Sequence, residues 1–350
     1  MNRRTRARLL PLLGLALVLS SCAQLGVRDG VLDSFDARGP IAEDLAGLFW
    51  LVFWIATAVF VLVQGGLLYT LFRFREKRDD PAEPKQFEGS PVLEVIWTVI
   101  PVVILAAIAV PTVERVFKYT ECAPDAMHVN VIGHQWWFEY YYPDHDIWTA
   151  NELVIPAGRE VCLTMTSGDV IHNYWAPKLN GKRYLIPGED TLLLLESFPL
   201  AEGVASEEFH VHCAEFCGLS HARMRARVIA VTDAGFAEWV VGQQTDAVEP
   251  STDLEVEGLA LFGEKGCSAC HVIRGVNDDV VDNTVVIGPE LTHFASRGSF
   301  AGSTLELSDP DALRMWLADP PTWKPGSFMP NLGLTADEID ALDAYLRSLR

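Results

Sequence analysis

The chain reads His212-Cys-Ala-Glu-Phe-Cys-Gly-Leu-Ser-His-Ala-Arg-Met224, and this segment places two thiols, an imidazole and a thioether close together. Sulfur and imidazole donors of this kind favour copper over magnesium, calcium or manganese. A mononuclear blue-copper site uses one cysteine, so the pair Cys213 and Cys217 predicts two copper ions that share both sulfurs. A structural disulfide or a zinc site is the alternative use of these cysteines, although neither requires Met224.

The same segment, with His172 in Gly168-Asp-Val-Ile-His-Asn-Tyr-Trp-Ala-Pro177, resembles the CuA copper loop of cytochrome c oxidase subunit II. The resemblance implies a cupredoxin-like β-sandwich in which Cys213 and Cys217 bridge two copper ions. The other ligands that it implies are His172, His221, the weak ligand Met224 and the backbone carbonyl of Glu215. It also implies that the Glu215 side chain faces subunit I, where the family holds a magnesium ion. Such a rigid metal pair serves one-electron transfer, at a potential that its surroundings tune.

A second motif, Cys267-Ser-Ala-Cys270-His271, is the signature of covalent c-type haem attachment. Both thiols would bond the haem, and His271 would be an axial iron ligand. A redox-active dithiol is the alternative, but it does not need the adjacent histidine. An electron-transfer haem usually has a second axial ligand, and methionine raises its potential. Met329 in Pro325-Gly-Ser-Phe-Met-Pro330 resembles the distal ligand of small cytochromes c.

Two other residues compete with Met329 for the distal position. Met315 lies in Ala312-Leu-Arg-Met-Trp-Leu317, where helical spacing favours a place in the core. His293 follows Gly288-Pro289 too closely to cross the haem. Pro289 instead resembles the family residue whose carbonyl accepts a hydrogen bond from the proximal imidazole.

The N-terminus has the pattern of an export signal. Four arginines precede the apolar stretch from Leu9 to Leu19, and small residues precede Cys22. Leu19-Ser-Ser-Cys22 resembles a bacterial lipobox, so residues 1–21 are predicted to be a lipoprotein signal peptide with lipidation at Cys22. Ordinary cleavage nearby is the alternative. Residues 22–44 would then form an exterior segment.

Two apolar segments, at about 45–72 and 93–114, predict a transmembrane helical hairpin over residues 45–116. Pro101 and Pro111 are compatible with a kinked but continuous second helix. The basic run Arg73-Phe-Arg-Glu-Lys-Arg78 between the spans predicts a cytoplasmic loop. The rest of the chain therefore lies on the outer face of the membrane. Glu94 resembles the glutamate at the mouth of a proton-uptake channel, and a solvated interfacial acid is the alternative.

Residues 120–240 contain short alternating runs separated by turn residues, which predict the β-sandwich. We expect most of the aromatic run Gln135-Trp-Trp-Phe-Glu-Tyr-Tyr-Tyr142 to form a membrane-interface belt, and ordinary strand packing is the alternative. Trp136 is the exception, because it resembles the family's surface tryptophan through which electrons reach the copper. Cys122 and Cys162 would lie in an oxidising compartment, where a disulfide and two buried thiols are both open.

The polar, acidic residues 241–253 predict a linker, and residues 254–350 have the size of one all-α class I cytochrome c domain. Leu254 to Lys265 predicts a helix that runs into the haem motif. Thr335-Ala-Asp-Glu338 is a capping box that opens a last helix. The family implies that these two helices cross.

Composition limits the classes of function. A net charge of −20 argues against nucleic acid as a partner and favours a basic or neutral docking protein, and the alternative is an acidic surface that serves solubility alone. The sequence also has no Walker loop, dinucleotide fingerprint or nucleophile elbow. A quinol oxidase subunit II would lack the copper ligands, a nitrous oxide reductase would carry a repeat domain, and a copper-delivery protein would not need a haem domain.

The resemblance implies subunit II of a caa3-type cytochrome c oxidase, a proton-translocating oxidoreductase of the bacterial cell membrane. It implies two copper ions, one covalent haem c and a magnesium ion shared with subunit I. Electrons would pass from the haem to the copper pair and on to haem a. The implied partners are subunit I with haem a and haem a3–CuB, subunit III, membrane lipid, and cytochrome c or a cytochrome bc complex as donor.

Overall fold

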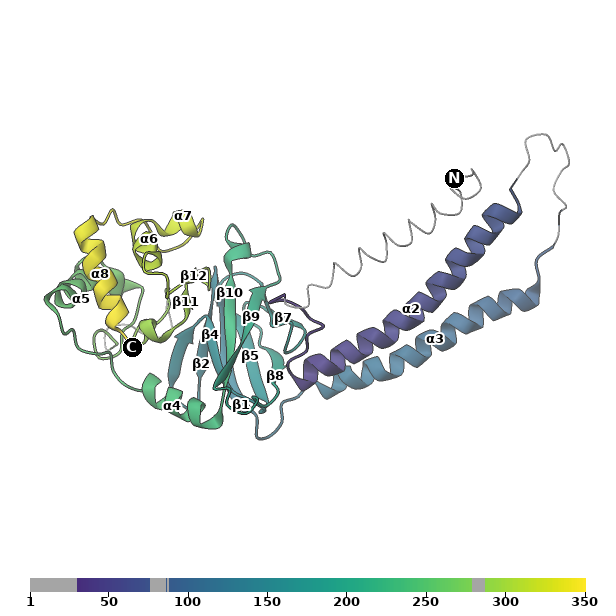
Figure 1. Ribbon diagram of the computed structural model, residues 1–350, viewed down its shortest axis with the longest axis horizontal. Coiled ribbons are helices and arrows are strands. Elements are labelled where there is room, and N and C mark those ends of the chain that lie inside the picture. Colours follow the sequence, from purple (N-terminus) through teal and green to yellow (C-terminus); the bar gives the residue numbers. More distant parts are fainter. Residues whose placement is uncertain (1–29, 76–85, 87, 279–286) are drawn as a thin grey trace, which may run out of the picture.

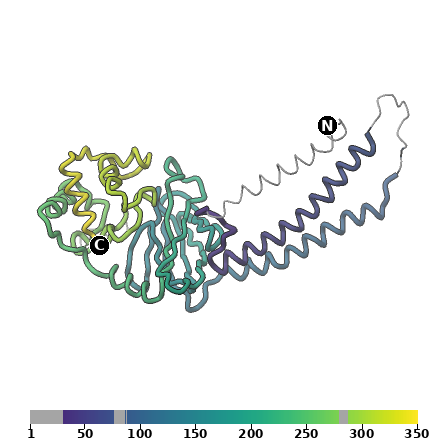
Figure 2. The backbone as a smooth tube through the Cα atoms, in the orientation of Figure 1, coloured from purple at the N-terminus to yellow at the C-terminus, as the bar shows by residue number. Residues whose placement is uncertain are grey.

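The structure of the protein, a computed structural model, describes residues 30–75, 86, 88–278 and 287–350. A β-sandwich lies between a long helical hairpin and a helical C-terminal domain (Figures 1 and 2). The predicted signal peptide, residues 1–21, and Cys22 lie outside the described residues, as does part of the basic run 73–78.

The hairpin consists of α2 (Pro40–Arg73) and α3 (Pro91–Lys118). Both helices are long and apolar enough to cross a membrane, and their apolar side chains are exposed. They extend beyond the spans expected from the apolar runs, because polar turns continue each helix at its ends. As predicted, α3 stays helical through Pro101 and Pro111.

Polar contacts join the two helices where they meet the sandwich. Asp44 of α2 lies 2.7 Å from Arg115 Nη2 and accepts a hydrogen bond from Tyr119 Oη at 2.7 Å. A disulfide then links Cys122 to Cys162 of strand β5, which decides between the two alternatives left open by the sequence. The end of the hairpin is therefore covalently tied to the sandwich.

The sandwich contains two five-stranded sheets. Sheet one has the order β3-β2-β1-β5-β8, and sheet two has the order β4-β10-β9-β6-β7. The strands are β1 (Met127–His134), β2 (Trp137–Tyr142), β3 (Ile147–Ala150), β4 (Glu152–Pro156), β5 (Val161–Ser167), β6 (His172–Trp175), β7 (Lys182–Leu185), β8 (Thr191–Leu195), β9 (Ser206–Cys213) and β10 (Arg225–Val231). Alternate residues of β1 and β9 are buried, as expected for strands with one face on a core. The sequence segment quoted first connects the antiparallel pair β9 and β10.

The aromatic run is not a membrane-interface belt, which corrects the expectation from the sequence. Phe138, Tyr140 and Tyr142 of β2 are buried in the core of the sandwich, and Trp137 is buried where it lines the cavity of the C-terminal domain. Tyr142 donates a hydrogen bond to Val154 O at 2.9 Å, so its polar end is satisfied within the protein. Phe138, Tyr140 and Tyr142 form part of the core that supports the copper loop.

A helix that the sequence did not indicate, α4 (Asp233–Gln243), follows β10. The C-terminal domain then begins with α5 (Asp253–Glu264) and ends with α8 (Ala336–Ser348), and both helices open with a capping box. Between them lie η2 (Cys267–Ala269), η3 (Phe294–Ser296), the hairpin β11 (Ser299–Phe300) and β12 (Leu305–Glu306), α6 (Ala312–Ala318) and α7 (Pro320–Trp323). As predicted, the first and last helices cross. At this crossing a Cβ on Gly258 would lie 2.2 Å from Ala341 O.

Candidate copper and haem sites

The two thiols of the quoted segment face each other at one end of the sandwich. Cys213 is the last residue of β9 and Cys217 lies in the following loop, and their Sγ atoms are 3.7 Å apart. A disulfide needs about 2 Å, so the pair is not cross-linked. Both side chains are buried, which leaves two free sulfurs in a water-poor pocket.

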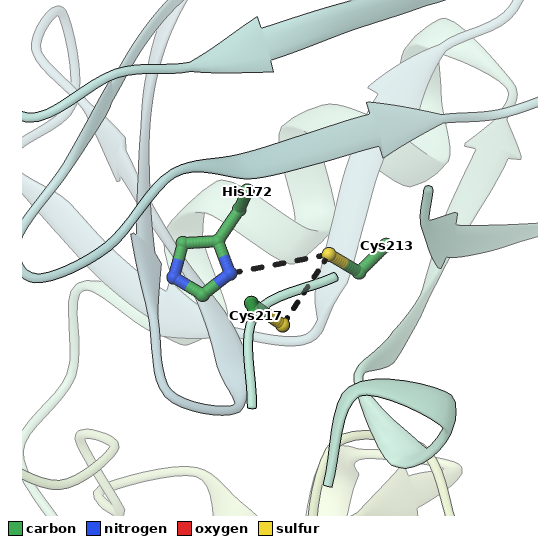
Figure 3. Close-up of side chains that lie close together, drawn as sticks. All are labelled: His172, Cys213 and Cys217. Atoms are coloured by element: carbon green, nitrogen blue, oxygen red, sulfur yellow. Dashed lines mark hydrogen bonds between the residues drawn. The ribbon is translucent and has the colours of Figure 1, made fainter. Parts of the chain in front are cut away.

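Further soft donors surround this thiol pair. His172 and His221 approach it from different elements, and Figure 3 shows His172 pointing toward both sulfurs. The distances are 3.9 Å from His172 Nδ1 to Cys213 Sγ, 3.5 Å from His221 Nδ1 to Cys217 Sγ, 3.8 Å from Met224 Sδ to Cys217 Sγ, and 3.2 Å from Cys213 Sγ to Glu215 O. The structure thus brings together all six residues that the resemblance implies. This donor set fits copper, because thiolate, imidazole and thioether are its preferred ligands.

The distance of 3.7 Å between the two sulfurs allows one shared proton in a hydrogen bond between them. The hydrogen bond from Cys217 and the contact with His172 lower the pKa of Cys213 to about 3. The hydrogen bond to the Cys213 thiolate, together with burial, raises the pKa of Cys217. A metal ion binds the thiolate form of cysteine, so its binding would release this shared proton.

Asp169 was not singled out in the sequence, yet its side chain contacts the candidate ligand His172. His172 Nε2 lies 2.8 Å from Asp169 Oδ1, which fixes the ring so that Nδ1 faces the thiols. The signal was present in the sequence, because Asp169 lies three residues before His172 in the quoted motif.

The haem motif lines a cavity of about 250 Å³ in the C-terminal domain. Cys267, Cys270 and His271 line it together with Met329. His271 Nδ1 lies 2.7 Å from Pro289 O, as the resemblance implied, so Nε2 is the nitrogen available to iron. Burial lowers the pKa of His271, which favours the neutral imidazole that a metal requires. The residues present therefore fit a c-type haem.

Gly288 is needed beside this imidazole. A Cβ at this position would lie 2.6 Å from His271 Cε1. The competitors of Met329 lie elsewhere. His293 Nε2 is 3.1 Å from Thr245 O, outside the haem cavity, and Met315 packs against the helical core.

Trp136 lies between the two candidate sites. Its Nε1 donates a hydrogen bond to Cys217 O at 3.0 Å, and its ring lines the haem cavity. We expected a surface tryptophan, but Trp136 is only 5% exposed. The C-terminal domain covers it, and a Cβ on Gly326 of that domain would lie 2.6 Å from the Trp136 ring.

Polar contacts hold the C-terminal domain on the sandwich. Glu152 Oε1 accepts hydrogen bonds from the backbone N–H groups of Gly298 and Ser299, each at 2.9 Å. Arg227 forms an ion pair with Glu306. Sequence patterns do not reveal these contacts, because each joins residues far apart in the chain.

Glu94 is remote from both sites. It lies in the first turn of α3, at the end of the hairpin far from the sandwich, and it is exposed (Figure 1).

Three family descriptions match the chain. "Cytochrome C oxidase subunit II, transmembrane domain" matches residues 30–114, "Cytochrome C oxidase subunit II, periplasmic domain" matches 145–231, and "Cytochrome c" matches 255–350. Together with the fold and the two sites, these matches define a membrane-anchored electron-transfer subunit of a haem–copper oxidase.

Curated relatives extend the match over almost the whole chain. Cytochrome c oxidase subunit 2 of Alkalihalophilus pseudofirmus is 33% identical, with 99% of this chain and 98% of the relative covered. The same subunit of Bacillus subtilis is 30% identical, with 98% of each chain covered. The chain belongs to the cytochrome c oxidase subunit II family. Quinol oxidase subunit 2 of Bacillus subtilis is 32% identical over 68% of this chain and 72% of the relative.

Among solved structures, the periplasmic domain of oxidase subunit II from Bradyrhizobium japonicum is 26% identical. The match covers 35% of this chain and 97% of the Bradyrhizobium chain, with a TM-score of 0.32.

Proposed function

We propose that this chain is subunit II of a caa3-type cytochrome c oxidase, which passes electrons from its own c-type haem through a CuA centre to haem a of subunit I. Oxygen would be reduced to water there, with proton pumping. The observation that carries the proposal is Trp136, which hydrogen-bonds the carbonyl of Cys217 and also lines the haem cavity. The haem would lie in a domain that packs on the sandwich, and a single side chain, that of Trp136, would separate the haem cavity from the copper loop.

The copper loop would hold two copper ions, which supply one-electron redox chemistry. The proposed ligands are His172, Cys213, Glu215 through its carbonyl, Cys217, His221 and Met224. Backbone hydrogen bonds close this loop, from Cys213 N to Met224 O at 3.0 Å and from Met224 N to His221 O at 3.1 Å. A closed, buried loop limits the movement of its ligands, which favours fast electron transfer.

The C-terminal domain would hold one haem c through Cys267 and Cys270. Its axial ligands would be His271 and Met329. The Pro289 carbonyl fixes the His271 ring, and most of the cavity lining is apolar. These features would keep the reduction potential of the haem high, as suits a donor to an oxidase.

The remaining proposals follow from the family. The domain limits would be 1–21, 22–44, 45–116, 120–240, 241–253 and 254–350, as expected from the sequence. The two outer domains would face the periplasm or exterior of a bacterial cell, with Cys22 lipidated. Glu215 would contribute to a magnesium site with subunit I, and Glu94 to proton uptake. Subunit III and a cytochrome c or cytochrome bc complex would complete the partners.

Paramagnetic resonance of the full-length protein purified from its host tests the copper assignment. Two equivalent copper ions should split the signal in a way that a mononuclear site does not. Cys217→Ser should abolish this signal and leave the haem absorption unchanged, because the haem lies in another domain. If Cys217→Ser lost neither the copper signal nor the haem absorption, the proposed copper ligands would be wrong. A wild-type protein that contained haem but no stoichiometric copper would refute the proposed function.

A further inference from the structure

Lys324 is a buried lysine that the proposed function does not use. It follows α7 and lines the haem cavity, and only 5% of it is exposed. Its Nζ donates a hydrogen bond to the backbone carbonyl of Trp136 at 2.5 Å. No ion pair to Lys324 occurs among the residues that the structure describes. Burial lowers the pKa of Lys324 to about 7. A buried amino group is costly unless hydrogen-bonded, so this contact with the sandwich accounts for its position.

The acceptor of this hydrogen bond leads directly to the copper loop. The carbonyl of Trp136 accepts the hydrogen bond from Lys324 Nζ, and the indole N–H of Trp136 donates to the carbonyl of Cys217 at 3.0 Å. Gln135, its chain neighbour, donates to the same Cys217 carbonyl at 2.6 Å. A displacement of the Trp136 backbone would therefore disturb two hydrogen bonds to a candidate copper ligand.

The segment that begins with Lys324 also carries the distal haem residue. Met329 lies five residues later, on the haem cavity, and the carbonyl of the intervening Pro325 accepts a hydrogen bond from Ser220 of the copper loop at 2.7 Å. This segment, residues 324–329, thus contacts the copper loop at one end and faces the haem cavity at the other.

The β11–β12 hairpin forms hydrogen bonds with the copper loop from a second direction. Thr304 Oγ1 donates to Arg223 O at 3.1 Å, and Arg225 N donates to Gly302 O at 3.1 Å. These two contacts lie on either side of Met224. Gly302 leaves room for the amino group of Lys324, because a Cβ at position 302 would lie 2.5 Å from Lys324 Nζ.

We propose that Lys324 is a positioning residue for electron transfer between the two domains, which holds Trp136 and the copper loop in register with the haem cavity. The inference rests on the proposed function. Under the proposed function the step it would serve is a transfer of one electron, in which the haem iron would be oxidised from Fe(II) to Fe(III) and the copper pair would be reduced by that electron. No bond would form or break, and the rate would depend on the separation and orientation of the two sites as well as on their potentials.

Rapid photoreduction of the haem in the assembled oxidase tests this role. The decay of the ferrous haem band and the bleaching of the copper band report the interdomain rate. Lys324→Met keeps the length of the side chain but removes its hydrogen bond, and we expect an about tenfold slower rate, since the loss of one buried hydrogen bond can shift docking by up to about that factor. Lys178→Met is the control, because Lys178 pairs with Asp36 outside both sites.

Thr304→Val is measured alongside, because it removes a neighbouring interdomain hydrogen bond without changing the shape of the side chain. A smaller slowing in this variant, with both absorption bands at their wild-type positions, supports the proposal. Wild-type rates in both variants with intact centres would overturn it. The wild-type protein tests the proposed function separately, because that function fails if oxidation of the haem is not matched by reduction of copper.

Discussion

Glu152 of β4 accepts a hydrogen bond from the backbone N–H of Ser299 at 2.9 Å, and this contact joins the sandwich to the C-terminal domain. Ser299 Oγ donates to the same carboxylate oxygen at 3.2 Å. Ser299 begins the β11–β12 hairpin, whose tip reaches the copper loop. A single carboxylate therefore fixes the base of the element that approaches Met224.

Removal of this carboxylate should weaken docking. Glu152→Ala leaves the N–H groups of Gly298 and Ser299 without their acceptor, at a cost of about 1.5–3 kcal/mol. Glu152→Gln keeps an acceptor oxygen and should largely preserve docking. Hydrogen exchange at the two amides distinguishes the variants. Equal protection in Glu152→Ala and the wild type would contradict the role of the carboxylate.

The same residue predicts a pH dependence. Burial raises the pKa of Glu152, against the opposing effect of the hydrogen bonds from Ser299. The folded protein then binds more protons at this site than the unfolded chain does above the ordinary pKa of 4.5. The stability of the wild type relative to Glu152→Gln should therefore be greatest below pH 4.5 and fall as the pH rises through the raised pKa. Thermal unfolding at a series of pH values measures this difference, and a difference that rises with pH would contradict it.

Met329 should control the potential of the haem. In Met329→Ala the iron loses its proposed thioether ligand, so its reduction potential should fall and its absorption should change to that of a high-spin haem. Met315→Leu should leave both unchanged, because Met315 packs against the helical core. Redox titration with optical detection checks the pair. The assignment would be reversed if the Met315 variant changed and the Met329 variant did not.

The crossing of α5 and α8 should not tolerate a larger residue. In Gly258→Ala the added methyl would lie 2.2 Å from Ala341 O, and overpacking of this kind costs about 1–3 kcal/mol. Gly263→Ala is a matched change in the same helix. The Cβ added at Gly263 would meet no other part of the protein within 4 Å, so this substitution should stabilise the helix by about 0.5–1 kcal/mol. Urea unfolding followed by haem absorption should separate the two in opposite directions; equal midpoints would contradict the close approach.

The disulfide at the base of the hairpin should stabilise the outer part of the chain. Replacement of both Cys122 and Cys162 by alanine should lower the free energy of unfolding by about 2–4 kcal/mol, chiefly because the unfolded chain is no longer constrained. The wild type treated with a reductant should show the same loss. A double variant as stable as the oxidised wild type would argue against a stabilising role.

Local patterns revealed much of this molecule before its structure was known. The haem motif, the two apolar spans and the capping box at Thr335 depend on residues near one another in sequence, so each was read directly. The ligand set around Cys213 and Cys217 came from a resemblance, and only the fold shows that His172 of β6 reaches it.

Features that depend on packing between distant segments could not be read in this way. The aromatic run of β2 has the composition of an interfacial belt, but Tyr142 packs against Trp239 of a helix that the sequence did not indicate. The resemblance implies a surface position for Trp136, whereas the C-terminal domain, which lies far along the chain, buries it. No sequence motif marks Glu152 or Lys324, because the role of each depends on a hydrogen-bond partner in the other domain.

The burial of Trp136 has a consequence for how the delivery of electrons would depend on concentration. A freely diffusing carrier must collide with its acceptor, so its delivery slows on dilution. A donor domain that already covers the indole is present at a high and constant local concentration, whatever the number of molecules in the surroundings. Under the proposed function, diffusion would limit only the loading of the haem, and the internal transfer would proceed at the same rate in a dilute suspension as in a crowded membrane.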